Sequence, residues 1–174
     1  MTQPDVNKVT LSVAGTLWVA APGELAAVRR MKTDTGAPLF WRLAARHGWQ
    51  GRGVADWAAI TRMLALLTPT GERSRDDGLH DPGTPLGAVL YGDGERPVLS
   101  EARLARLLST RGDQRRLALE RAVRMLARHQ PRFNLPDLAW AVLNPQGSAR
   151  IARDYYARLD KVAPKENEKD QTNG

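Results

Sequence analysis

Apolar residues recur along most of this chain at the spacing of one face of an α-helix. The segment 54–67 is a clear case, with apolar side chains three or four residues apart at Trp57, Ile60, Met63, Leu64 and Leu67. This period predicts an amphipathic helix. No alternating run of β-branched residues occurs, and no Asn-Gly turn joins two apolar segments, so strand signals are nearly absent. The pattern predicts an all-α protein.

Residues that start and stop helices bound the predicted elements. Pro38 and Pro136 suit the first turn of a helix, Gly48 suits a C-terminus, and Ser100 is a good N-cap. The predicted helices cover approximately residues 9–21, 23–32, 39–47, 54–67, 86–91, 101–110, 113–130, 135–144 and 148–160. The first segment could also be a secretory signal, but its apolar run is diluted by polar residues and Asp5 offsets Lys8. An ordinary first helix is therefore the favoured interpretation.

A polar stretch rich in Gly, Pro and Asp, from Glu72 to Pro85, separates two halves of the helical pattern. We interpret it as a mobile loop. The sequence thus predicts two small helical bundles packed in one compact chain. The N-terminal bundle with its trailing loop covers residues 1–84, the arginine-rich C-terminal bundle covers 85–160, and a disordered polar tail covers 161–174.

The composition excludes several classes of protein. Without cysteine, the chain can form no disulfide, zinc–thiolate site or thiol nucleophile. No apolar run approaches the roughly 18 residues of a membrane-spanning helix. We therefore expect a cytoplasmic protein with no membrane partner.

Positive charge is concentrated in one part of the chain. The formal net charge is +7, and residues 100–160 alone hold twelve Arg, no Lys and six Asp or Glu. Arginine favours planar, bidentate contact with phosphate or carboxylate. A general bias toward Arg over Lys explains the choice of cation but not its local excess. Nucleic acid is the favoured partner, with an acidic protein surface or a plain solvated face as the alternatives.

Helical phase makes this charge more specific. In the helix that starts near Asp113, four apolar residues fall on one face: Leu119, Ala122, Val123 and Leu126. Arg121, Arg124 and Arg128 fall together on the opposite face, and Glu120 is predicted to lie off this stripe. Further arginines of the same region are expected to surround it: Arg103, Arg106, Arg111, Arg115, Arg116, Arg150 and Arg153. Because no base-reading motif is present, these residues predict contact with the nucleic-acid backbone without sequence preference.

Catalytic chemistry has no comparable signal. The three histidines are far apart in sequence, and only one cluster resembles a metal site: Asp76, Asp77, His80 and Asp81. It lies in the predicted mobile loop, where ligand geometry would not be pre-organised. No phosphate-binding glycine loop or nucleophile elbow occurs. We predict no catalytic residue, metal or cofactor, and therefore a protein that is not an enzyme.

Several segments, in order, resemble the small subunit of the type I-E CRISPR Cascade complex, the CasB family. They are LAAVRR at 25–30, FWRL at 40–43, HGW at 47–49, SEARL at 100–104, LARHQPRFNLPDL at 126–138 and RDYY at 153–156. The resemblance implies an all-helical fold of two small bundles. It also implies two copies that lie head to tail in a ribonucleoprotein with guide RNA, in contact with the backbone and large subunits. The family's basic surfaces hold DNA strands of the R-loop while the guide RNA reads the sequence.

The resemblance also extends the set of predicted nucleic-acid contacts. Arg29 and Arg30 match paired basic residues of the family, Arg52 lies near another, and Arg103 and Arg111 fall on or near further ones, as does Arg121 or Arg124. Before the last helix relatives carry adjacent basic residues, whereas this chain has Asn-Pro-Gln-Gly at 144–147, so Arg150 is the nearest substitute. The predicted set is Arg29, Arg30, Arg52, Arg103, Arg111, Arg121, Arg124, Arg128 and Arg150. The alternative function is a helical protein–protein scaffold whose arginines meet acidic partners.

Overall fold

Helices make up the regular structure of the chain in the computed structural model, which describes residues 5–74 and 77–162. The elements are α1 (Val6–Trp18), α2 (Pro22–Arg30), α3 (Pro38–His47), α4 (Arg52–Leu67), α5 (Leu86–Tyr91), α6 (Glu101–Ser109), α7 (Gly112–Ala127), α8 (Leu135–Leu143), the 3-10 turn η1 (Pro145–Gly147) and α9 (Ser148–Val162). Extended pairing in the described part is limited to one isolated bridge between His80 and Phe133. The all-α prediction is confirmed. No described helix is both long and apolar enough to cross a bilayer.

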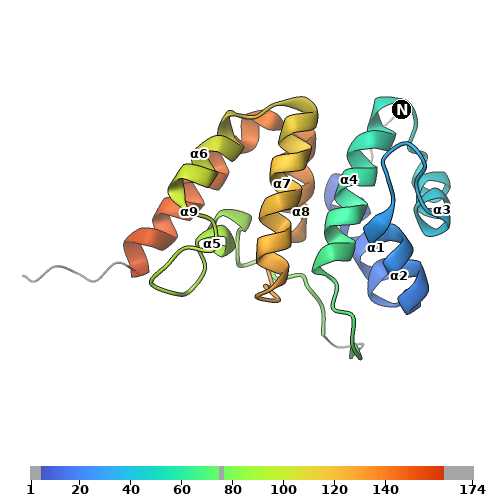
Figure 1. Cartoon of the computed structure of the whole chain (residues 1–174), viewed down its shortest axis with the longest axis horizontal. Helices are drawn as coiled ribbons and strands as arrows, with labels where there is room; N and C mark the ends of the chain where they lie inside the picture. The colour runs from blue at the N-terminus through green and yellow to red at the C-terminus, as the bar shows by residue number, and fades with distance from the viewer. Residues whose placement is uncertain (1–4, 75–76, 163–174) are drawn as a thin grey trace, which may run out of the picture.

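Helix α4 lies at the centre of the packing. Its Ile60, Met63 and Leu64 are fully buried, as the apolar period of this segment predicts. In Figure 1, α7 and α8 lie beside α4 and separate it from α5, α6 and α9. Helix α4 packs on α7, α1 packs on α8, and α5 packs on α9. One apolar core therefore runs through both halves of the described chain.

The helix ends agree only partly with the sequence signals. Gly48 closes α3 in the left-handed conformation, with φ of 67°, which suits a residue without a Cβ atom. Ser100 and Asn134 do precede α6 and α8, but neither side chain makes a capping hydrogen bond. Instead, Asn134 Nδ2 donates to Asp137 Oδ1 at 2.8 Å. Ser100 is thus the N-cap of α6, as predicted, but it lacks the side-chain hydrogen bond that usually favours serine at this position.

Part of the polar stretch between the halves is fixed by tertiary contacts. The backbone amide of Asp81 donates to the Phe133 carbonyl at 2.9 Å, and the Phe133 amide donates to the Leu79 carbonyl at 3.1 Å. Leu79 is buried. The prediction of a mobile loop is thus wrong for residues 79–81, because Leu79 joins the core and its neighbours pair with the segment before α8.

Tyr155 anchors α9 to the start of α6. It is fully buried, its hydroxyl donates to the Leu99 carbonyl at 2.7 Å, and its ring meets Tyr91 edge-on at 5.4 Å. Burial, followed by the negative charge of Glu101, raises the pKa of Tyr155 to about 12. The neutral phenol is therefore the form that the folded protein holds.

The Tyr155→Phe variant is expected to lose about 1 kcal/mol of unfolding free energy at neutral pH, because the Leu99 carbonyl loses its donor. An unfolded tyrosine ionises near pH 10, below the folded value of about 12. The wild-type protein should therefore lose stability as the pH rises from about 10 to 12. Urea titrations of both proteins at several pH values would measure this loss, and an equal loss in the variant would contradict its assignment to Tyr155.

Candidate nucleic-acid interface

Helix α7 presents its arginines as the helical phase predicts. Leu119, Ala122, Val123 and Leu126 are buried against the core, whereas Arg121, Arg124 and Arg128 are exposed. The apolar face is fixed by packing on α4 and α5. The opposite face is therefore free to present cations to a ligand.

Glu120 is not separate from this stripe, contrary to the prediction. Its carboxylate accepts from Arg124 at 2.8 Å on one side and from Arg62 of α4 on the other. Glu120 and Arg62 are only 12% and 20% exposed as side chains, whereas Arg124 is 54% exposed. Arg124 is thus partly neutralised by a carboxylate that joins α7 to α4. The sequence could not reveal this pair, because Arg62 and Glu120 lie 58 residues apart.

Helix α6 adds a cation to the same face. The guanidinium of the exposed Arg103 lies 3.7 Å from the sulfur of Met125. Met125 is one helical turn from both Arg121 and Arg128, so Arg103 lies beside them. We call Arg103, Arg121, Arg124 and Arg128 the α6–α7 arginine face. Within residues 5–74 and 77–162, no carboxylate forms an ion pair with the first, second or fourth of these.

The arginines at the α6–α7 junction have three different environments. Arg111 is exposed and donates to the carbonyls of Leu108 and Thr110 at 2.9 and 2.8 Å. Arg116 is held between Asp56 of α4 and Asp113. Arg115 is only 2% exposed. The expectation that Arg115 joins the cationic surface is wrong, since its guanidinium points into the core.

Arg29 and Arg30, which the resemblance treats alike, differ in the structure. Arg29 Nε donates to the Ala65 carbonyl at 2.8 Å and its terminal nitrogen donates to the Thr68 carbonyl. Arg29 therefore caps the C-terminal end of α4, and burial, followed by the charge of Arg73, lowers its pKa. Arg30 is exposed. The side chain of Arg52, at the start of α4, lies outside the described residues.

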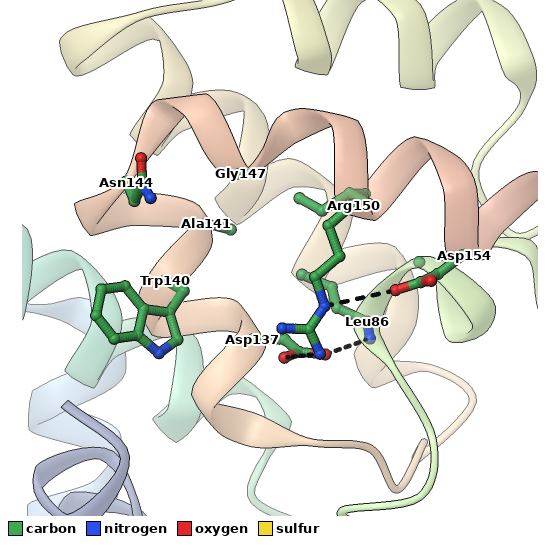
Figure 2. Close-up of a pocket in the computed structure, with 10 residues that line it drawn as sticks. Leu86, Asp137, Trp140, Ala141, Asn144, Gly147, Arg150 and Asp154 are labelled. Carbon is green, nitrogen blue, oxygen red and sulfur yellow. Dashed lines mark hydrogen bonds and ion pairs between the residues drawn. The ribbon is translucent and has the colours of Figure 1, made fainter. Parts of the chain in front are cut away.

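Arg150 lies at the rim of a pocket of about 340 Å³ between α5, α8 and α9. Figure 2 shows its guanidinium among carboxylates. It lies 3.3 Å from Asp137 and 3.8 Å from Asp154, while the half-exposed ring of Trp140 lines another side of the pocket. A phosphate at Arg150 would have to compete with both carboxylates. Arg153 is also paired with Asp154, at 3.1 Å.

The possible metal cluster of the polar stretch has a structural role in its described part. The Asp81 carboxylate accepts from the Thr84 hydroxyl at 2.7 Å and from the Gly83 amide at 2.9 Å, and these bonds lower the pKa of Asp81. His80 Nδ1 accepts from the Leu135 amide at 3.3 Å. Asp76 lies outside the described residues. Among residues 5–74 and 77–162, no three His, Asp or Glu side chains converge as metal ligands.

Three exposed cations outside the predicted set surround a single groove: Arg96, Arg132 and Lys161. They come from the α5–α6 loop, the segment before α8 and the end of α9. No local sequence signal joins residues so far apart, so sequence reasoning missed them. Only the packing of α5 against α9 and α7 brings them together.

The fold and this surface define an all-helical protein with an arginine face made by two consecutive helices that contact each other. The family model described as CRISPR-associated protein Cse2 matches residues 24–156. This chain belongs to that family, which confirms the resemblance to the small subunit of type I-E Cascade.

Comparison with solved structures agrees on the fold. A chain in the crystal structure of E. coli Cascade bound to a PAM-containing dsDNA target matches with a TM-score of 0.66 and 18% sequence identity. The match covers 87% of this chain and 96% of that chain. No curated protein matches.

Proposed function

We propose that this protein is a non-catalytic subunit of a cytoplasmic CRISPR ribonucleoprotein surveillance complex. In that complex it binds nucleic-acid backbone without sequence specificity and stabilises the R-loop during recognition of antiviral targets. The observation that carries the proposal is membership of the Cse2 family across residues 24–156. The structural match to a Cascade chain over 87% of the protein supports it further.

The α6–α7 arginine face is the surface that we assign to the nucleic acid. Its cations come from the outer sides of two rigid helices, and three of them have no carboxylate partner in the described chain. Guanidinium groups bind phosphate oxygens through charge-assisted hydrogen bonds, and such contacts carry no sequence information. The role of guide RNA in such complexes is to supply the sequence specificity that this surface lacks.

Other faces of the protein are available for the protein partners of the complex. We assign these to the backbone subunits, the large subunit and a second copy of this chain. Trp41 and Trp140 are 45% and 41% exposed, and Val19 is 72% exposed. Large apolar side chains at the surface are common at protein interfaces. A protein scaffold whose arginines meet acidic partners is the alternative function.

A triple variant with Arg103, Arg121 and Arg128 replaced by Ala is expected to weaken DNA binding about tenfold at low salt. Three exposed contacts at about 0.5 kcal/mol each give this magnitude. The slope of log affinity against log salt should become shallower by about 2–3, because three phosphate contacts are lost. Fluorescence anisotropy titrations with two DNA strands of unrelated sequence at several salt concentrations would measure both quantities.

A matched control removes the same charge elsewhere. Lys8, Arg42 and Arg46 are exposed on α1 and α3 and lie outside the predicted contacts, so their triple Ala variant should retain the wild-type slope. Wild-type affinity that does not change with salt would contradict backbone binding. Co-purification with the other subunits after nuclease treatment, without affinity for free DNA, would favour the scaffold.

A further inference from the structure

A groove of about 780 Å³ lies between the end of α5, the loop after it, the C-terminal end of α7 and the last turns of α9. Its volume falls within the roughly 300–1,000 Å³ that is usual for ligand sites. In Figure 1, α5 and the loop after it lie between the C-terminal ends of α7 and α9. The groove is separate from the Arg150 pocket, although Asp154 contributes to both.

The charge of the groove favours an anion. Four cations line it: Arg96, Arg132, Arg158 and Lys161. Arg158 is neutralised by an ion pair with Asp93, and it also donates to the Gly92 carbonyl at 3.2 Å. Asp154, the other carboxylate in the lining, is engaged by Arg150 and Arg153. Arg96, Arg132 and Lys161 thus keep positive charge that no ion pair of the described chain compensates.

The size of the groove, about 780 Å³, suits a few nucleotides of one strand rather than a double helix. Its floor includes the aliphatic side chains of Val89, Val98 and Leu126, and no Phe, Tyr or Trp is among the described residues that line it. Stacked bases are held in proteins by aromatic rings, so this floor offers contact to sugar and base edges without stacking. The cations at the rim would then supply the phosphate contacts.

The groove is also continuous with the α6–α7 arginine face. Arg128 is the last residue of that face and caps the C-terminus of α7, and the next residue, His129, lines the groove. A strand that follows α7 along Arg121 and Arg128 therefore comes directly to the lining of the groove. The phosphates of such a strand would reach Arg132 after Arg128.

We propose that this groove is a second binding site, which holds the phosphate backbone of a single nucleic-acid strand as it leaves the α6–α7 arginine face. The inference rests on the proposed function and adds to it the residues Arg96, Arg132 and Lys161. It predicts that the full contact requires a strand long enough to occupy both surfaces. Shorter strands should occupy the arginine face alone.

The test is a series of oligothymidylate strands of increasing length, titrated against the full-length protein at several salt concentrations. For wild-type protein the affinity and the salt slope should both increase with length until the two surfaces are filled. The triple variant Arg96→Ala, Arg132→Ala and Lys161→Ala should reach its maximum at a shorter length. Its slope with long strands should be shallower by about 2, since each phosphate contact to a single strand contributes about 0.7.

Two controls separate this inference from the proposed function. All three groove side chains are exposed, so the melting temperature of the variant should equal that of the wild-type protein. The variant with Lys8, Arg42 and Arg46 replaced by Ala loses the same charge and should show the wild-type length dependence. If the groove variant does so too while the α6–α7 face variant loses affinity, the groove inference alone is overturned. If the wild-type protein binds no strand at low salt, both are overturned.

Discussion

Replacing Arg115 with Ala is expected to lower the free energy of unfolding by about 3–5 kcal/mol, the usual cost of truncating a large buried side chain. Arg115 is 2% exposed and is among the largest fully buried side chains. Its Nε donates to the Ala141 carbonyl at 2.7 Å, in the last turn of α8, and a terminal nitrogen lies 3.5 Å from the Leu107 carbonyl of α6. Truncation would leave a cavity where α6, α7 and α8 meet, and a helix-end carbonyl without its donor.

Two further variants separate the effect of the lost side-chain volume from that of the lost charge and provide an exposed control. Arg115→Met fills most of the volume without the charge, and burial, followed by the charge of Arg111, already lowers the pKa of Arg115. We therefore expect Arg115→Met to cost less than Arg115→Ala, because an apolar side chain escapes the desolvation penalty. Arg111→Ala, on the exposed side of the same junction, is the control and should change stability by no more than about 0.5 kcal/mol. Urea denaturation measures all three, and a loss below about 1 kcal/mol for Arg115→Ala would contradict the buried position.

Replacing Glu120 with Ala is expected to lower the free energy of unfolding by about 2–3 kcal/mol. Glu120 bridges Arg62 of α4 and Arg124 of α7. Arg62 also donates to the Met31 carbonyl at 3.0 Å, but without Glu120 its charge would remain largely buried and unpaired. Breaking a fully buried pair costs about 3–5 kcal/mol, and the partial exposure of this pair places the expected value below that range.

The same variant has a functional readout that a purely structural role would not produce. Without Glu120, Arg124 loses its carboxylate partner and the α6–α7 arginine face gains a net positive charge. DNA affinity at low salt should therefore increase even though stability falls. Asp113→Ala removes an exposed carboxylate paired with Arg116 and serves as the matched control for both measurements. A fall in affinity of the folded Glu120→Ala protein would contradict the placement of the nucleic acid on this face.

These two predictions concern side chains that the sequence could not place correctly. Arg115 and Glu120 belong to one helix whose apolar residues were assigned to the core by their period alone. That assignment is correct for Leu119, Ala122 and Val123. Periodicity predicts the direction in which a side chain leaves its own helix. It does not predict which neighbouring helix packs against that side. Here α4, α6 and α8 cover flanks of α7 that an isolated helix would expose.

The arginines proposed to contact nucleic acid show the same division between local pattern and tertiary packing. The α7 stripe was predictable because its three arginines share one helical face, and the spacing of residues in the sequence determines which side chains share a face. The difference between Arg29 and Arg30 was not, because Arg29 caps a helix 36 residues further along the chain. The cations of the groove were missed altogether, since residues 96, 132 and 161 meet only through tertiary packing.

The sequence by itself determined the all-α class, the approximate extent of the helices, the family and the location of excess positive charge. These properties depend on the spacing of apolar residues, on residues that end helices, on the order of the family segments and on composition. All of these can be read directly from the sequence. Only the tertiary structure decided which arginines pair with carbonyl or carboxylate groups of the protein and which remain available to a binding partner. The physical reason is that a guanidinium is neutralised or buried by groups close in space, and in this chain those groups come from helices distant in sequence. The α6–α7 arginine face and the groove beyond it are the surfaces that keep cations without an ion-pair partner in the described chain.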